Sequence, residues 1–275
     1  MAGFHFGAVM KAKIGIPSTL SCLPLKRWLA GTRSFEIQES SVVEIATLFR
    51  KRDLQAAFVS PIEFARGSSE YRILPGFALS ARFGIALHFR EGLRKIGTMA
   101  ANPADISEIV LARIVLAEEF ETAPPIVPSA GGRLQALLAK TDSVLLTGDS
   151  RLRELSRDPH SIDIAEIWSD MVDLPYVYGV LCAREGLFPA DALSELTSQD
   201  WEALSRDVAE EDIPAELRGE GQIVRVNEFL DECSYALSNE AEEGLMEFLR
   251  YAHYHGMIAD IPLLQPYSSG SGDIL

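Results

Sequence analysis

Cysteine is scarce in this chain of 275 residues. Its three cysteines, Cys22, Cys182 and Cys233, form no Cys-x-x-Cys pair. An odd number without paired spacing argues against a disulfide framework and against a cysteine zinc site. Glycine-rich nucleotide fingerprints, phosphate-binding loops, serine elbows and zinc-protease helices are also missing from the sequence. We therefore expect neither a metal nor a cofactor.

The sequence also has few positively charged residues and no long apolar runs. Lysine and arginine number 25 against 40 aspartates and glutamates, which gives a net charge of −15. So acidic a chain repels a phosphate backbone, so we expect no nucleic-acid partner. No run approaches the ~20 apolar residues of a spanning helix, and Met1 to Lys13 lacks a secretory core. These absences favour a cytoplasmic protein without membrane contact, as a monomer or a homodimer.

Short apolar runs alternate with helical patterns along most of the chain, which predicts α/β units around a parallel sheet. The run 76–89 and the apolar strand 176–182 break this rhythm, and we interpret them as two crossings between two lobes. Lobe one would hold residues 1–80 with 184–275, and lobe two residues 81–183. The two crossings would form a hinge, with a ligand in the cleft between the lobes. From Pro189 onward the pattern predicts helices only, at 190–196, 201–208, 226–237 and 241–254.

Small hydroxyl residues recur where a predicted strand gives way to a helix. Such a junction offers free backbone amides and a hydroxyl, which suit a carboxylate ligand. Any one of them is explained by ordinary helix capping, but four in cleft-facing loops predict a shared anion site. The candidates are Ser18, Thr19, Ser60, Ser107, Thr147, Gly148 and Asp149.

Several stretches, spread in order over most of the chain, match one known family. They are GIPSTLSCLPL (15–25), FVSPIEF (58–64), LLTGDS (145–150), DIAEIW (163–168), LPYVYGV (174–180) and the segment from RYA (250–252) to Pro262. The chain resembles the menaquinone-biosynthesis family that contains chorismate dehydratase and the dihydroxynaphthoate synthase of the futalosine route. This resemblance implies an α/β, two-lobe type II periplasmic-binding-protein-like fold.

The resemblance also implies an activity. A chorismate dehydratase-like lyase would eliminate water from chorismate, a small carboxylated ligand, to give an enolpyruvyl benzoate. The seven candidate residues named above would line its cleft. The alternative is a non-catalytic intracellular binding protein for a small carboxylate.

Three departures from the family pattern bear on this choice. The dehydratase branch has a substrate-contacting asparagine where this chain has Ser21. A Val-x-Ser-Val pattern in the hinge strand is replaced by 83–86, and the helix start of lobe two keeps Ser107 beside Asp105 and Glu108. An ionised Glu108 facing the cleft would repel a dianionic substrate.

A proton must also leave the ring, which calls for a base with a pKa near the operating pH. The synthase branch uses a histidine of lobe two. Here His88, in the hinge strand, is the candidate base, and His160 is a second possibility. The substrate's own enolpyruvyl carboxylate is the alternative, because positioning alone accelerates such a step.

Overall fold

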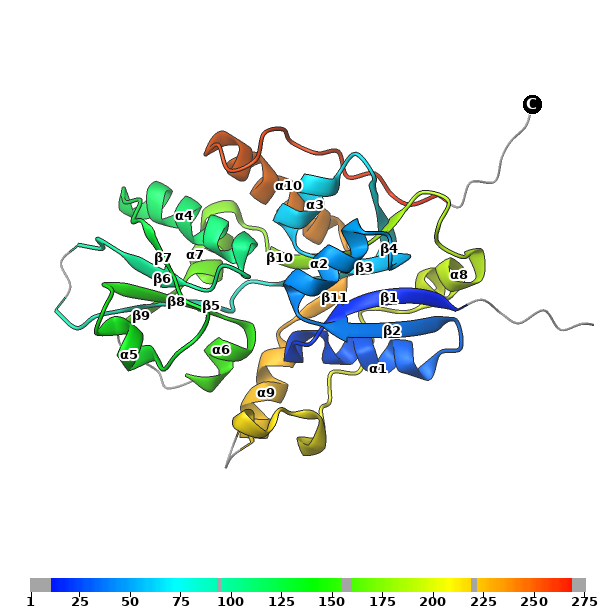
Figure 1. The fold of residues 1–275 in the computed structure, drawn as a ribbon, viewed down its shortest axis with the longest axis horizontal. Helices are drawn as coiled ribbons and strands as arrows, with labels where there is room; N and C mark the ends of the chain where they lie inside the picture. The colour runs from blue at the N-terminus through cyan, green and yellow to red at the C-terminus, as the bar shows by residue number, and fades with distance from the viewer. Residues whose placement is uncertain (1–10, 93–94, 155–159, 219–221, 269–275) are drawn as a thin grey trace, which may run out of the picture.

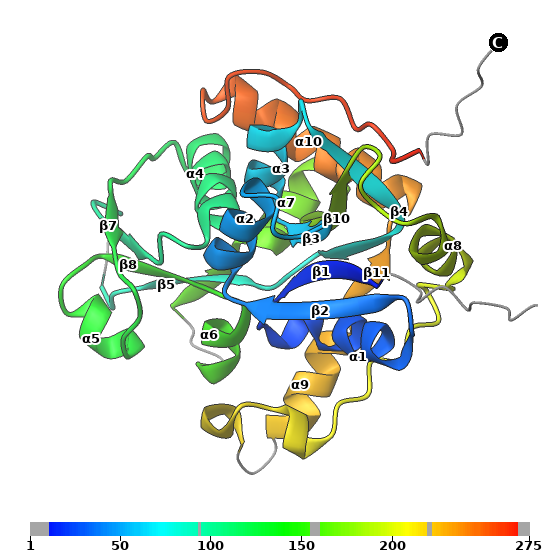
Figure 2. The same cartoon turned by 45° about the vertical axis from the view of Figure 1, so that its right-hand side comes forward.

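The computed structural model describes residues 11–92, 95–154, 160–218 and 222–268. Two sheets lie side by side in it, each with its own helices (Figure 1, Figure 2). The larger has six strands in the order β11-β4-β10-β3-β1-β2, and the smaller has five in the order β7-β6-β8-β5-β9. The predicted α/β fold with two lobes is therefore confirmed.

The elements run as follows. The larger sheet consists of β1 (Ala12–Pro17), β2 (Phe35–Ser40), β3 (Ala56–Val59), β4 (Tyr71–Ala81), β10 (Tyr176–Arg184) and β11 (Ser234–Ala236). The smaller consists of β5 (Ile85–Phe89), β6 (Met99–Ala101), β7 (Ile126–Pro128), β8 (Ser143–Thr147) and β9 (Ser161–Asp163). The helices are η1 (Leu20–Cys22), α1 (Leu23–Gly31), α2 (Val42–Arg50), α3 (Pro61–Gly67), α4 (Ile106–Phe120), α5 (Leu134–Leu138), α6 (Gly148–Arg153), α7 (Ile164–Val172), α8 (Ala190–Ser198), η2 (Glu210–Asp212), η3 (Ala215–Leu217), α9 (Gln222–Asp231) and α10 (Asn239–Tyr254).

The larger sheet begins with parallel strands, as the alternating pattern predicts. β1 pairs in parallel with β2 and β3, while β10 runs antiparallel to both β3 and β4. Helix α2 packs closely on β1 and requires a glycine there, because a Cβ at Gly15 would lie 2.9 Å from Ile45 of α2 and 2.5 Å from Leu54, which follows the helix. Its start is capped by Ser41, whose hydroxyl accepts a hydrogen bond from the Glu44 amide at 3.2 Å.

The chain passes between the sheets twice, before β5 and after α7. The Asp163 carboxylate joins the first passage to the start of α7: it accepts from the amide of Gly84 at 2.8 Å and from the amide of Ala165, in α7, at 3.0 Å. Gly84 has φ +122°, and a Cβ there would lie 2.4 Å from the Tyr178 hydroxyl, so the turn requires glycine. β10, placed in lobe two at the sequence level, pairs wholly with strands of the larger sheet. The exact lobe boundaries stay a prediction.

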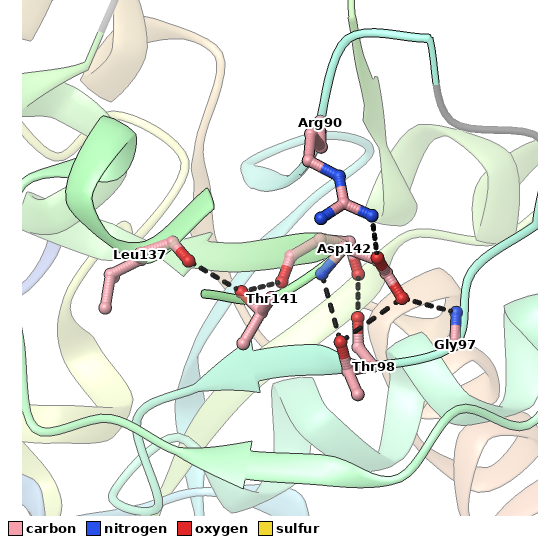
Figure 3. A network of polar contacts seen from close by, with 7 residues as sticks. Arg90, Gly97, Thr98, Leu137, Thr141 and Asp142 are labelled. Carbon is pink, nitrogen blue, oxygen red and sulfur yellow. Dashed lines mark hydrogen bonds and ion pairs between the residues drawn. The ribbon is translucent and has the colours of Figure 1, made fainter. Parts of the chain in front are cut away.

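The far end of the smaller sheet is fastened by Asp142, which precedes β8 (Figure 3). Its carboxylate accepts from the Gly97 amide at 3.0 Å and the Thr98 hydroxyl at 3.3 Å, and it pairs with Arg90. These residues come from the ends of three strands, so the network fixes the register of β5, β6 and β8. The opposite ends of β6 and β8 carry the helix starts described below.

The expectation of helices alone after Pro189 is wrong in two places. No helix covers 201–208, where Trp201 is buried and its indole nitrogen donates to the Leu196 carbonyl at 3.0 Å. The helix predicted at 226–237 ends at Asp231, and 234–236 form β11 on the edge of the larger sheet. The cause is Tyr235, which is wholly buried and whose hydroxyl donates to the Ser21 carbonyl at 3.1 Å. Tertiary contacts therefore override the helical pattern here.

Within the described ranges, no helix is both long and apolar enough to cross a membrane. Residues 1–10, which make up most of the segment used to argue against a secretion signal, lie outside those ranges.

Candidate functional site

A cavity of about 280 Å³ lies where β6 and β8 end. The two strands are parallel, so their carboxyl ends meet at one edge, which is the usual ligand position in α/β sheets. Helices α4 and α6 begin at this edge, and Thr19 of the larger lobe closes it from the other side. The polar residues in the lining are Thr19, Asn102, Asp105, Ser129, Thr147, Asp149, Ser150 and Arg153.

One contact joins the lobes directly at the cavity. The Asp149 carboxylate of α6 accepts a hydrogen bond from the Leu20 amide of η1 at 3.0 Å. On the same turn the hydroxyls of Thr19 and Ser21 lie 3.2 Å apart. The amide predicted to hold a ligand carboxylate is thus occupied by the chain's own carboxylate. Asp149 supplies this anionic oxygen internally, so the binding of a ligand anion here stays a prediction.

A second contact joins the starts of α3 and α4. The Ile62 amide donates to the hydroxyl of Ser107 at 3.0 Å, and Ser107 is wholly buried. Ser60 occupies the N-cap of α3, but its side chain makes no capping bond there. Two of the four predicted junctions therefore meet face to face.

Asp105 and Thr147 tie the starts of α4 and α6 together within the smaller lobe. The Thr147 hydroxyl donates to Asp105 at 2.6 Å. Burial raises the pKa of Asp105, and this hydrogen bond partly offsets the shift. Thr147 also caps α6, in a reciprocal arrangement with Ser150. Gly148 follows with φ +47°, a conformation that glycine adopts readily.

The predicted site residues fall into separate groups. Thr19, Thr147, Gly148 and Asp149 line one cavity, while Ser60 and Ser107 belong to the α3–α4 contact beside it. Ser18 is exposed, and its hydroxyl donates to the Ser40 carbonyl at 3.2 Å, away from the cavity lining.

The two candidate histidines lie elsewhere on the smaller sheet. His88 is buried in β5 opposite Val144, three positions before Thr147. At ~3.3 Å per residue this sets it back roughly 10 Å from the strand end. His160 lies just before β9, beside a different hollow lined also by Arg90 and Gln135. The roles of both as bases stay predictions.

Reasoning from the sequence did not select Tyr176, and it treated Glu108 only as a source of repulsion. Burial and, second, the charge of Asp105 raise the pKa of Glu108 to about 8. Glu108 is therefore mostly a neutral acid at pH 7, and the expected repulsion of an anion is largely removed. Tyr176 is wholly buried in β10, and this burial raises the pKa of its hydroxyl well above the ordinary value. The sequence signal for Tyr176 was a hydroxyl-bearing residue within an otherwise apolar strand.

We expect Asp149→Ala to weaken the contact between the lobes. The Leu20 amide would lose its acceptor, which costs roughly 1–3 kcal/mol of unfolding free energy when the amide stays dry. Urea unfolding with a fluorescence readout measures the loss. Asp149→Asn is the matched control, since its amide oxygen still accepts and most of the stability should remain. Equal stability of Asp149→Ala and the native chain would contradict the assigned contact.

Comparison with known proteins agrees with this architecture. A family model described as menaquinone biosynthesis matches residues 12–254. The chain belongs to the menaquinone biosynthesis family. The match spans the two sheets and the cavity, and it assigns the chain a role in menaquinone biosynthesis, as the motifs predicted. No curated protein matches the sequence significantly.

Solved structures similar to this family member show the periplasmic-binding-protein fold. AF1704 from Archaeoglobus fulgidus has a TM-score of 0.64 at 16% identity, covering 90% of this chain and 98% of that one. The periplasmic aliphatic sulphonate binding protein SsuA from Escherichia coli has a TM-score of 0.62 at 12% identity, covering 98% and 96%. SsuA from Xanthomonas axonopodis pv. citri, bound to MOPS, has a TM-score of 0.61 at 13% identity, covering 94% and 97%. At these identities the likeness establishes the fold.

Proposed function

We propose that this family member is a chorismate dehydratase-like lyase. The observation that carries the proposal is the cavity at the ends of β6 and β8, where hydroxyls and helix starts of both lobes meet. Sulfonate binding by SsuA, which has the same fold, supports a small anion as the ligand. Membership of the menaquinone biosynthesis family supports a compound of that pathway as the ligand, and chorismate, a carboxylated one, is the compound we propose.

The main task of the protein in this reaction is to hold the substrate in the reactive orientation. Loss of one ring proton and one hydroxyl as water makes the ring aromatic, which drives the elimination. The substrate's own enolpyruvyl carboxylate takes the proton when the cavity holds it against the ring, because orientation supplies much of the rate. Thr19, Thr147 and Gly148 would fix the substrate, with Ser21 adjoining. His88 is kept as an alternative base.

The test is to incubate the purified protein with chorismate and follow ultraviolet absorbance and product mass. We expect a slow rise in aromatic absorbance and a product lighter than chorismate by one water. A protein-free sample is the control. A Thr147→Val variant, which keeps the side-chain shape but loses the hydroxyl that would fix the substrate, should form product more slowly. Unchanged chorismate after prolonged incubation would reject the lyase.

A binding protein without catalysis is the second candidate function. Ser21 in place of the family's asparagine is the observation that favours it, because a shorter side chain leaves a polar contact unmade. Isothermal titration calorimetry with chorismate separates the two candidates. Binding without turnover supports this reading, and turnover rejects it.

A further inference from the structure

The lining of the cavity at the ends of β6 and β8 holds more acidic than basic side chains. Asp105 and Asp149 both line it, and Arg153 is the one positively charged side chain among the described residues that do. The chain as a whole carries a net charge of −15. A dianion that enters this cavity is therefore repelled by the protein unless Arg153 offsets that repulsion.

Both aspartates of the lining are engaged by groups of the protein itself. The Thr147 hydroxyl donates to Asp105 at 2.6 Å, and the Leu20 amide donates to Asp149 at 3.0 Å. No ion pair joins either carboxylate to Arg153 within the described part of the chain. The two aspartates therefore have partners without Arg153, and they leave its charge uncompensated.

Arg153 is the last residue of α6, and its side chain is exposed. It makes no hydrogen bond or ion pair with any residue of the described ranges. Arg151 shows the contrast, because it pairs with Asp163 at 3.0 Å and lies over the Phe83 ring at 5.4 Å. Asp149 and Arg153 are four residues apart, which places both on the side of α6 that borders the cavity. The Arg153 guanidinium is therefore available to a molecule in the cavity, whereas that of Arg151 is held by the fold.

The remainder of the cavity suits the face of a ring. Its apolar lining comes from β6, α5 and β8 and consists of Ala100, Ala101, Leu137, Val144, Leu145 and Leu146. A planar guanidinium donates two parallel hydrogen bonds to a carboxylate and stays charged at every ordinary pH. A ring that lies on the apolar lining can therefore present a carboxylate to Arg153 at the end of α6.

We propose that Arg153 binds one carboxylate of a ring dicarboxylate in this cavity and thereby selects a dianion as the ligand. The other carboxylate is left to Thr19, Thr147 and Gly148, which the proposed function already assigns to the substrate. This inference rests on the proposed function and deepens it, because chorismate is such a dicarboxylate and Arg153 is the residue that recognises its second charge.

The experiment is calorimetric titration at neutral pH with benzene-1,3-dicarboxylate and with 3-(aminomethyl)benzoate, in which an ammonium group replaces one carboxylate. The protein is the full chain, either native or carrying Arg153→Gln, Arg153→Glu or Arg66→Glu. Arg66 is exposed on α3, outside the cavity lining, and is likewise unpaired within the described ranges. Arg66→Glu therefore makes the same change of net charge away from the cavity. Thermal melts confirm that each variant is folded.

We expect the native chain to bind the dicarboxylate more tightly than the ammonium ligand. Arg153→Gln should weaken binding of the dicarboxylate about tenfold, the lower end for a hydrogen bond to a charged group, because the guanidinium is exposed to solvent. Arg153→Glu should invert the preference, since it repels the carboxylate and attracts the ammonium group. The ratio of the two affinities should then change by about a hundredfold, and Arg66→Glu should leave that ratio close to the native one.

The possible failures are distinguishable. If the dicarboxylate binds but Arg153→Glu keeps the native preference, the role of Arg153 is wrong and the cavity stands. An equal change of the affinity ratio in Arg66→Glu, or a native chain that prefers the ammonium ligand, also overturns it, because the charge of the whole protein then decides the preference. If the native chain binds neither probe, carboxylate binding itself fails, and the proposed function falls with the role of Arg153. An inverted preference without turnover of chorismate supports Arg153 and rejects only the lyase.

Discussion

Asparagine in place of Ser21 is expected to raise the rate of chorismate dehydration by about 10²–10³-fold. That is the usual effect of one well-aimed hydrogen bond made in the transition state. The serine hydroxyl is short and lies 3.2 Å from the Thr19 hydroxyl, so it is already engaged within its own turn. An asparagine amide reaches further and offers both a donor and an acceptor. Initial rates with saturating chorismate measure the change.

Ser21→Ala is the matched control, since it empties the position without extending reach, and it should bring no gain. A native turnover near the typical enzyme value of about 10 per second would show that Ser21 suffices. If Ser21→Asn binds chorismate but remains inactive, the result favours the binding-protein alternative.

Glu108→Gln should stabilise the protein at alkaline pH by roughly 2–4 kcal/mol, a range reduced from the full shift because the side chain is partly exposed. The pKa of Glu108 is about 8 in the folded chain, against an ordinary value of 4.5 for a glutamate. The folded state therefore binds this proton more tightly than the unfolded state. The resulting stability is fully present below about pH 4.5, declines as the pH rises through this window, and is lost above about pH 8.

Urea unfolding of both proteins across this window tests the prediction. The curves should coincide near pH 4.5 and separate progressively towards pH 8, with the glutamine variant more stable. Glu119→Gln, on the exposed side of the same helix, is the control and should show no such separation. Parallel curves for the native chain and Glu108→Gln would mean that the fold does not raise the pKa of Glu108.

Much of the fold is predictable because local pattern and tertiary structure agree. The apolar run at 56–59 forms β3 and the proline after it begins α3, since apolar runs and helix-start chemistry act locally. Strand β11 is not predictable in this way. Its three residues depend on pairing with β4 and on burial of Tyr235, neither of which leaves a periodic signal. The same holds for Trp201, whose aromatic contacts replace the expected helix.

The candidate site is predictable in its parts but not in their arrangement. The hydroxyl-bearing junctions identify Ser107 and Thr147, because helix starts require such residues. That Ser107 binds the Ile62 amide, and Asp149 the Leu20 amide, depends on how two lobes meet. The altered ionisation of Glu108 also comes from three-dimensional burial. From the sequence alone Glu108 is a charge, whereas in the fold it is mainly a neutral acid.

The position of β10 has a consequence for how the chain is made. It lies between β3 and β4, yet 94 residues separate the end of β4 at Ala81 from its own start at Tyr176. On the ribosome, β3 and β4 emerge first, each with an open edge that invites wrong pairing. All strands of the smaller sheet, from 85 to 163, are synthesised before β10 arrives. The nascent chain can therefore complete the smaller sheet before β10, which joins β3 to β4 in the larger sheet, has been synthesised.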